Sequence, residues 1–136
     1  MSDYAKPLPP DDPANRPFWQ GAKRGELMLQ RCCDCGRHRF PATRLCAQCR
    51  GDNSEWVATP GAGVVESFCT FHRAYWPAFK ADLPYDVVQV RLDEGVRMFS
   101  NLVGVAQGQA RTGMRVRAAF EPATAAVTLV KFGPAP

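Results

Sequence analysis

Short runs of alternating apolar and polar residues dominate the chain from residue 56 onward. Each run is rich in valine, phenylalanine or alanine, and they span Val64–Phe71, Val87–Leu92, Arg97–Val103, Met114–Glu121 and Ala126–Phe132. A period of two is typical of strands with one buried and one solvated face. Glycine and proline separate the runs, as they do between strands. The pattern therefore predicts five strands.

The connections between these runs indicate how the strands are arranged. Asp93–Gly95 is a tight hairpin, with Gly95 able to take a positive φ. The segment Gly104–Gly113 leaves room for one turn of helix, and Gly61 and Gly63 permit a bend or bulge near the first strand. Five antiparallel strands with a short helical link after the third match the OB-fold, which closes into a small barrel. A thin β-sandwich is the alternative.

A different period appears earlier, at residues 16–25. Asn15 is a candidate N-cap, Pro17 suits the first turn, and Gly25 ends the segment, so we expect a short helix. One apolar stripe would be shared by Phe18, Trp19 and Ala22. A helix this short is unstable alone, so its stripe must pack on this chain or on a partner.

The first 15 residues contain prolines at positions 7, 9, 10 and 13. These residues carry too little apolar content to fold alone, which predicts an extended arm that is disordered when the protein is alone.

Two CxxC pairs lie between the predicted helix and the alternating strands. Two residues between thiols let one tight turn direct both sulfurs at one ion, and two such turns complete a tetrahedron. We therefore assign one structural zinc ion to four ligands: Cys32, Cys35, Cys46 and Cys49. Cys33 is excluded, because pairing it with Cys35 leaves one residue between ligands. Iron in a rubredoxin-like centre uses a similar four-thiolate site and stays open as an alternative.

Composition limits the class of protein. The first residues are polar and proline-rich where a secretory signal needs an apolar run, and no apolar stretch approaches the ~18 residues that span a bilayer. We expect a soluble, cytoplasmic protein without a membrane segment, in which clustered thiols bind metal rather than form disulfides. A zinc tetrathiolate lowers the formal charge of +4 by two, which leaves a weak positive bias.

These divisions give three expected regions: an arm and short helix at 1–26, a zinc ribbon at 27–55 and an OB-fold at 56–136. The order of motifs resembles the family called domain of unknown function 35, which joins a helical segment, a rubredoxin-like zinc ribbon and an OB-fold. The matching stretches are Phe18-Trp19, Gly25-Glu26-Leu27, both CxxC pairs, Gly61–Val65, Leu83-Pro84-Tyr85, Leu92–Gly95 and Gly113-Met114. The chain departs from the family pattern at Pro41–Arg44 and at Arg50, which replaces a glycine.

The resemblance implies a non-catalytic accessory subunit. Such proteins associate with thiolase-like enzymes, with aldolases that shorten steroid or acyl side chains, and with acyl-CoA hydratases, where they complete or stabilise the acyl-CoA site. The sequence is compatible with this role, since His38 and His72 have no evident nucleophile beside them. Cys69 lies on an alternating strand and is interpreted as a packed thiol.

An aromatic loop after the first barrel strand, residues 72–85, is the candidate contact surface. It mixes aromatic and cationic side chains, which is typical of interfaces. Arg73 or Lys80 would meet a CoA phosphate, and Trp76 or Phe79 would face adenine or a protein pocket. The same aromatic residues would equally suit a cap on the open end of the barrel. Phe18 and Trp19 are further candidates for partner contact.

The rival function is binding of single-stranded nucleic acid, because many such modules are OB-folds with a zinc ribbon. Three arginines would track the backbone: Arg111, Arg115 and Arg117. The small net charge and the strand-like alternation of these arginines disfavour nucleic acid.

Overall fold

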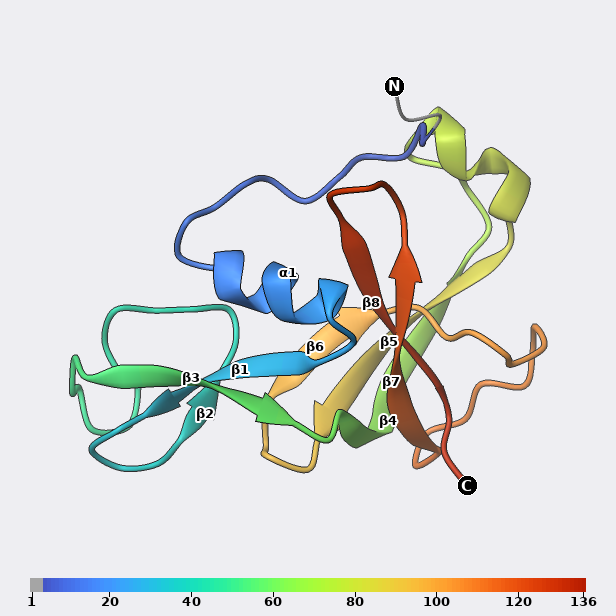
Figure 1. The fold of residues 1–136 in the computed structure, drawn as a ribbon. Coiled ribbons are helices and arrows are strands. Elements are labelled where there is room, and N and C mark those ends of the chain that lie inside the picture. The colour runs from blue at the N-terminus through green and yellow to red at the C-terminus, as the bar shows by residue number, and fades with distance from the viewer. Residues whose placement is uncertain (1–3) are drawn as a thin grey trace.

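The computed structural model describes residues 4–136, which form one short helix and two antiparallel sheets (Figure 1). The smaller sheet has the order β2-β1-β3, and the larger has the order β6-β5-β4-β7-β8. The helical elements are α1 (Arg16–Lys23) and the 3-10 helix η1 (Pro77–Asp82). The strands are β1 (Leu27–Cys32), β2 (His38–Arg39), β3 (Ser54–Thr59), β4 (Ala62–Phe71), β5 (Tyr85–Leu92), β6 (Arg97–Ser100), β7 (Arg115–Pro122) and β8 (Thr128–Pro134).

The larger sheet curls until its first strand approaches its last. Ser100 Oγ donates to the Val130 carbonyl (2.7 Å), and a parallel bridge joins Leu102 to Phe132 beyond the end of β6. A bulge between Val65 and Ser67 bends β4, as closure of a small barrel requires. The predicted mainly β fold with a five-stranded OB-type barrel is confirmed.

The helical turn predicted after the third barrel strand is absent from residues 104–113. Gly104, Gly108 and Gly113 all have φ between 69° and 87° there, so the segment turns repeatedly instead of winding into a helix. The short helical element lies in the aromatic loop as η1, where Pro77 occupies the first turn.

One apolar core joins the helix, the base of the ribbon and the barrel. The barrel contributes Val65, Val88, Val90, Leu92, Val116 and Phe132, each with no exposed surface. Leu27 and Leu29 of β1 belong to the same cluster, as does Phe18 of α1. The smaller sheet is therefore continuous with the barrel core at its base.

Helix α1 packs on its own chain through the predicted stripe. Phe18 and Ala22 are buried, and Trp19 is half-buried with its ring edge against Phe18 (4.9 Å between centroids). Gly25, at φ 80°, ends the helix, since a residue in this conformation closes the last turn without strain. Asn15 stands at the N-cap position, but its Oδ1 accepts the Ala42 N–H (2.8 Å) and makes no capping bond.

The predicted N-terminal arm begins at residues 1–3, which lie outside the described residues. From residue 4 to residue 12 the chain contains no helix or strand and follows an extended path (Figure 1). Lys6 fastens it to η1 by an ion pair with Asp82 (2.6 Å) and lies over the Phe79 ring (5.3 Å). The arm is therefore attached to the aromatic loop.

Candidate metal centre and contact surface

Two tight turns of nearly identical geometry present the four predicted ligands. In the first, Cys32 N–H donates to the Arg37 carbonyl (2.9 Å) and Gly36 N–H to the Cys32 carbonyl (2.9 Å). In the second, Cys46 N–H donates to the Gly51 carbonyl (2.9 Å) and Arg50 N–H to the Cys46 carbonyl (2.8 Å). This repeated pattern follows from the two CxxC spacings, because each turn must direct two side chains to one point.

The turns need a left-handed residue just after the second thiol of each pair. Gly36 supplies it at φ 79°, and Arg50 supplies it at φ 63°. Arg50 is the only described non-glycine residue, among residues 4–136, with a positive φ. The arginine that departs from the family pattern thus keeps the backbone shape of a glycine, at the steric cost of its Cβ.

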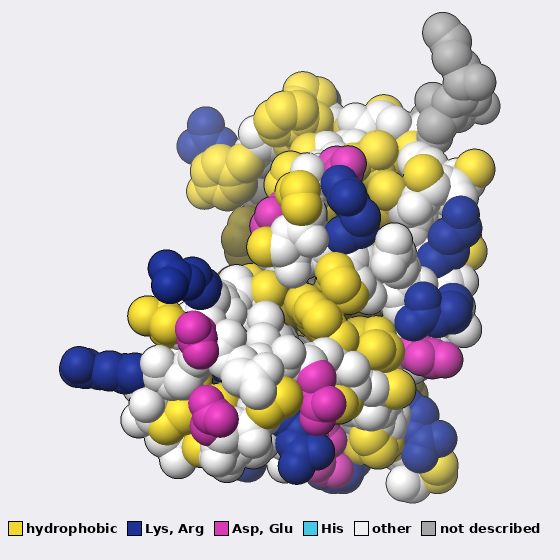
Figure 2. All heavy atoms as spheres, turned by 60° about the vertical axis from the view of Figure 1, so that its left-hand side comes forward, with side chains coloured by type: hydrophobic (Ala, Val, Ile, Leu, Met, Phe, Trp, Pro, Cys, Tyr) yellow, Lys and Arg dark blue, Asp and Glu magenta, His cyan; other side chains and the backbone are white. Residues whose placement is uncertain are grey.

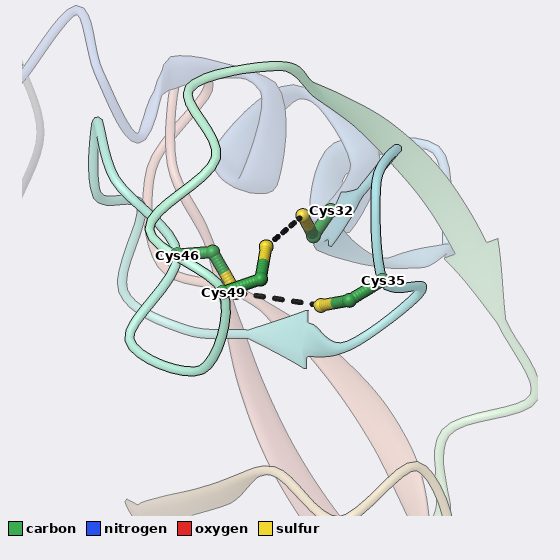
Figure 3. Close-up of side chains that lie close together, drawn as sticks. All are labelled: Cys32, Cys35, Cys46 and Cys49. Carbon is green, nitrogen blue, oxygen red and sulfur yellow. Dashed lines mark hydrogen bonds between the residues drawn. The ribbon is translucent and has the colours of Figure 1, made fainter.

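The four sulfurs converge from the two turns (Figure 3). Cys32 Sγ lies 3.5 Å from Cys49 Sγ, and Cys35 Sγ lies 3.6 Å from Cys46 Sγ. All four ligand atoms lie within 4.8 Å of one another. Four sulfurs at about 2.3 Å from a central zinc ion would be about 3.8 Å apart, so the observed cluster fits a zinc tetrathiolate.

Backbone N–H groups favour the charged form of two of these thiols. The N–H groups of Cys49 and Gln48 lower the pKa of Cys46 to about 6. The N–H of Cys35 lowers the pKa of Cys32. Hydrogen bonds to a thiolate stabilise it, so these turns are prepared for a cation.

Crowding has the opposite effect on Cys49. The Gly51 N–H lowers its pKa, but the sulfur of Cys32, burial and the two remaining sulfurs outweigh that bond and raise the pKa to about 12. Four thiolates at this spacing repel one another unless a cation lies between them. The donor set and its charge therefore fit one structural zinc ion with no open coordination position.

The two remaining cysteines lie outside the cluster. Cys33 is exposed and does not belong to the group of converging ligands. Cys69 is also exposed, so its interpretation as a packed thiol is wrong. It faces outward because the bulge in β4 changes which side of the strand each later residue occupies.

The aromatic loop divides between the two roles expected for it. Phe79 is half-buried against Tyr85 (5.6 Å between centroids), and Tyr85 stacks on Phe71 (5.2 Å), so these rings cover the barrel end. Trp76 is 51% exposed and Tyr75 is 74% exposed. Phe79, Tyr85 and Phe71 therefore pack against one another, whereas Trp76 and Tyr75 are available for contact with another molecule.

The predicted cations of this loop are both exposed. The Arg73 guanidinium lies over the Tyr75 ring (5.4 Å), and Lys80 is an exposed residue of η1. Phe18 and Trp19 lie apart from this loop, on α1. Because Phe18 is only 4% exposed, Trp19 is the member of that pair with surface to offer.

A cavity of about 480 Å³ lies beside η1 and includes residues that sequence reasoning missed. Its walls come from the arm, the loop and the end of the barrel: Lys6, Phe79, Tyr85, Asn101, Leu102 and Lys131. Nothing in the sequence places Lys6 here, because an arm without regular structure carries no periodic signal of its docking site.

Of the three arginines considered for nucleic-acid binding, Arg115 is paired within the chain. Arg115 donates to Asp93 through both terminal nitrogens (3.0 and 3.2 Å). On the face in Figure 2, Lys and Arg side chains are scattered among Asp and Glu side chains. A backbone-tracking groove instead requires a continuous run of unpaired cations.

Comparison with known proteins agrees with this architecture. Residues 19–55 match the model of the ChsH2 rubredoxin-like zinc ribbon domain, and residues 56–121 match that of the ChsH2 C-terminal OB-fold domain. A DUF35 domain-containing scaffold protein of Methanocaldococcus jannaschii is 31% identical over 104 residues, which cover 75% of this chain and 73% of that protein. The chain belongs to the DUF35 family.

Two further proteins similar to this chain have names that refer to enzymes. A probable enoyl-CoA hydratase alpha subunit of Thermomonospora curvata is 37% identical over 133 residues, which cover 96% of this chain and 41% of the subunit. This chain thus spans about two fifths of that relative. The DUF35 structure titled Ltp2-ChsH2(DUF35) aldolase superposes with a TM-score of 0.84 at 34% identity, over 95% of this chain and 100% of that chain.

The family description also decides between the metals weighed above. The matching model is that of a zinc ribbon, and the cluster geometry accommodates zinc, so the DUF35 ribbon of this chain carries one structural zinc ion. Neither helical element formed by residues 4–136 has the length or apolar character that crossing a bilayer would need.

Proposed function

We propose that this chain is a non-catalytic accessory subunit of an acyl-CoA-processing enzyme. Its partner is a thiolase-like enzyme or an aldolase of steroid or acyl side-chain degradation, and the chain helps to form or stabilise the partner's acyl-CoA site. The observation that carries this proposal is the likeness to the whole DUF35 chain of an aldolase, at 34% identity and a TM-score of 0.84.

The exposed part of the aromatic loop is the proposed contact with partner and CoA. Trp76 offers a large exposed ring, and aromatic residues of this kind often contribute most of the free energy at protein interfaces. Arg73 and Lys80 lie on the same loop and would bind a phosphate of CoA. Phe79 packs against the barrel and would hold the loop in place.

The test is reconstitution with the thiolase-like enzyme or aldolase of the native host. Co-expression should yield a complex of defined stoichiometry, and the partner's turnover of its acyl-CoA substrate should depend on this chain. Trp76→Ala should weaken the complex at least about tenfold in dissociation constant, as expected for a central aromatic contact. Phe68→Ala is the matched control, because Phe68 is 42% exposed but lies on β4.

Two results would contradict the proposal. Turnover of an acyl-CoA by the isolated chain would refute the non-catalytic role. Salt-dependent retention on single-stranded nucleic acid, with no binding to either enzyme class, would favour the rival function.

A further inference from the structure

Strand β6 has an unpaired edge at Arg97 and Phe99. The Leu92 N–H donates to the Val96 carbonyl (2.8 Å), which makes this pair a hydrogen-bonded one. Pairs in an antiparallel ladder alternate, so the peptide groups of Arg97 and Phe99, two pairs apart, point away from β5. Among residues 4–136, no hydrogen bond reaches those peptide groups. An exposed row of this kind is a template for another strand.

Two hollows flank this edge. One of about 540 Å³ lies between the ribbon and the β5–β6 hairpin and includes Arg97 in its wall. The other, of about 230 Å³, lies between α1 and the closing strands and includes Phe99. Phe40 of the ribbon lines both, so the ribbon and the helix leave space along the free edge.

Aromatic side chains border the second hollow. Phe99 is 74% exposed, although it lies in the middle of a strand. Trp19 and Phe40 are half-buried nearby, and Phe40 packs against Phe18 (4.5 Å between centroids). An added strand would place alternate side chains against such surfaces.

The first hollow is lined by two arginines that have no ion-pair partner among the described residues. Neither Arg37 nor Arg39 forms an ion pair with any carboxylate among residues 4–136. Arg39 is held rigidly, because its Nε donates to Gln30 Oε1 (2.7 Å) and its Nη2 to the Thr43 carbonyl (2.9 Å). Its third nitrogen, Nη1, is buried without an acceptor.

A buried hydrogen-bond acceptor without a donor among residues 4–136 lies in the same hollow. Glu94 Oε1 is buried without a donor among the described residues. Buried polar atoms normally have partners, so two unsatisfied ones at one hollow indicate that its wall is completed from outside. Neither atom reaches the surface in the chain alone.

We propose that an extended, acidic segment of a partner polypeptide pairs with the free edge of β6 and fills both hollows. Its backbone supplies partners to the peptide groups of Arg97 and Phe99, and a backbone N–H supplies the donor for Glu94. Its carboxylates neutralise Arg37 and Arg39. The inference rests on the proposed function only in requiring a protein partner, and it assigns that partner a second contact apart from the aromatic loop.

Short random peptides displayed on phage are the probe, selected on the zinc-loaded full chain. We expect selected peptides to be enriched in Asp and Glu. Phe99→Pro should reduce their affinity at least about tenfold, because proline removes the outward N–H while the bonds to β5 remain. Arg39→Gln should give a similar loss. Phe68→Ala is the control, since Phe68 is an exposed aromatic residue (42%) on β4, outside both proposed contact surfaces, and it should change nothing.

Hydrogen exchange of the unmodified chain is a readout that does not depend on the folding of any variant. Bound peptide should slow hydrogen exchange of the Phe99 and Arg97 amides specifically. Selection of no peptide, equal binding by Phe99→Pro, or protection of amides elsewhere would overturn the inference.

Association with the partner enzyme separates this inference from the proposed function. If the chain binds the enzyme and both Phe99→Pro and Arg39→Gln bind it equally well, the proposed function stands and the strand-pairing inference fails. If selected acidic peptides bind the β6 edge but no thiolase-like enzyme or aldolase associates, the inference stands and the proposed function fails.

Discussion

The tip of the ribbon and the barrel are stabilised by different forces. Between residues 33 and 53, Cys46 is the only buried residue, and Leu45 is 48% exposed. The barrel instead buries six apolar side chains with no exposed surface. A segment without a core must obtain its stability from its metal, whereas the barrel obtains it from apolar burial.

The boundary between the part stabilised by metal and the part stabilised by apolar burial lies within the ribbon itself. Leu27 and Leu29 of β1 belong to the barrel cluster, although β1 pairs with the ribbon strands. The pairing of β1 with β3 continues from Leu27 to Cys32, where the first ligand lies. Dependence on zinc should therefore begin at the tip and leave the base intact.

Cys46→Ser should produce the largest difference in stability between the ribbon tip and the barrel. Zinc content should fall from one equivalent to none, and the tip should lose the apparent stabilisation that structural zinc gives small domains, about 10–16 kcal/mol. Elemental analysis and hydrogen exchange measure both: amides of residues 33–53 should exchange fast while barrel amides stay protected. Cys33→Ser is the control and should change neither, and equal effects from both variants would refute the ligand assignment.

Phe132→Ala should destabilise the barrel and leave the zinc site intact. Truncating a fully buried phenylalanine costs about 3–5 kcal/mol, so the denaturation midpoint should fall strongly while zinc content under native conditions stays at one equivalent. Phe99→Ala is the matched exposed control, expected within about 0.5 kcal/mol of the unmodified chain. Loss of zinc in Phe132→Ala before unfolding would show that the regions are not separable.

Arg50→Gly should strengthen the tip by a smaller amount. Arg50 holds φ 63°, and glycine relieves the steric cost of that conformation, about 1 kcal/mol. Zinc affinity measured against a competing chelator should rise about fivefold. Gly36→Ala should weaken it, since Gly36 has φ 79° in the equivalent turn. Unchanged affinity in both variants would mean that these turns relax freely.

Asp93→Asn should have the smallest effect, confined to the barrel. The bond from Arg115 holds the pKa of Asp93 below its ordinary 3.8. A depressed folded pKa means that the pair stabilises above pH 3.8 and that this contribution disappears as the pH falls through the lower folded value. Urea midpoints of both chains should therefore differ slightly at neutral pH and converge in acid. The difference is small because both side chains are half exposed.

Much of the fold could be predicted because its strands alternate. The five barrel strands lie within a few residues of the expected runs. The sequence does not predict Ser54–Thr59 as a strand, since its paired residues on β1 lie 22 or more positions away and only tertiary pairing selects it. β3 also crosses the expected limit between ribbon and OB-fold at residue 55.

The ligand set was accessible from spacing, but the rest of the candidate site was not. CxxC spacing encodes a local turn, which the sequence shows directly. The flanks of the β6 edge depend on how the ribbon lies against the β5–β6 hairpin, and no local pattern encodes that placement. Asn15 illustrates the same limit, because its local role as a cap is replaced by a bond to Ala42.

Helix α1 packs against β8, the last strand of the described fold. On a ribosome, the helix would emerge long before this strand. The part of the helix that β8 covers would stay solvated until about a hundred further residues had been made, a delay of about 5–20 seconds at ordinary elongation rates, whereas β1 and Phe40 would reach the helix earlier. The nascent chain would thus expose an apolar helix for chaperones, while the zinc turns could already close.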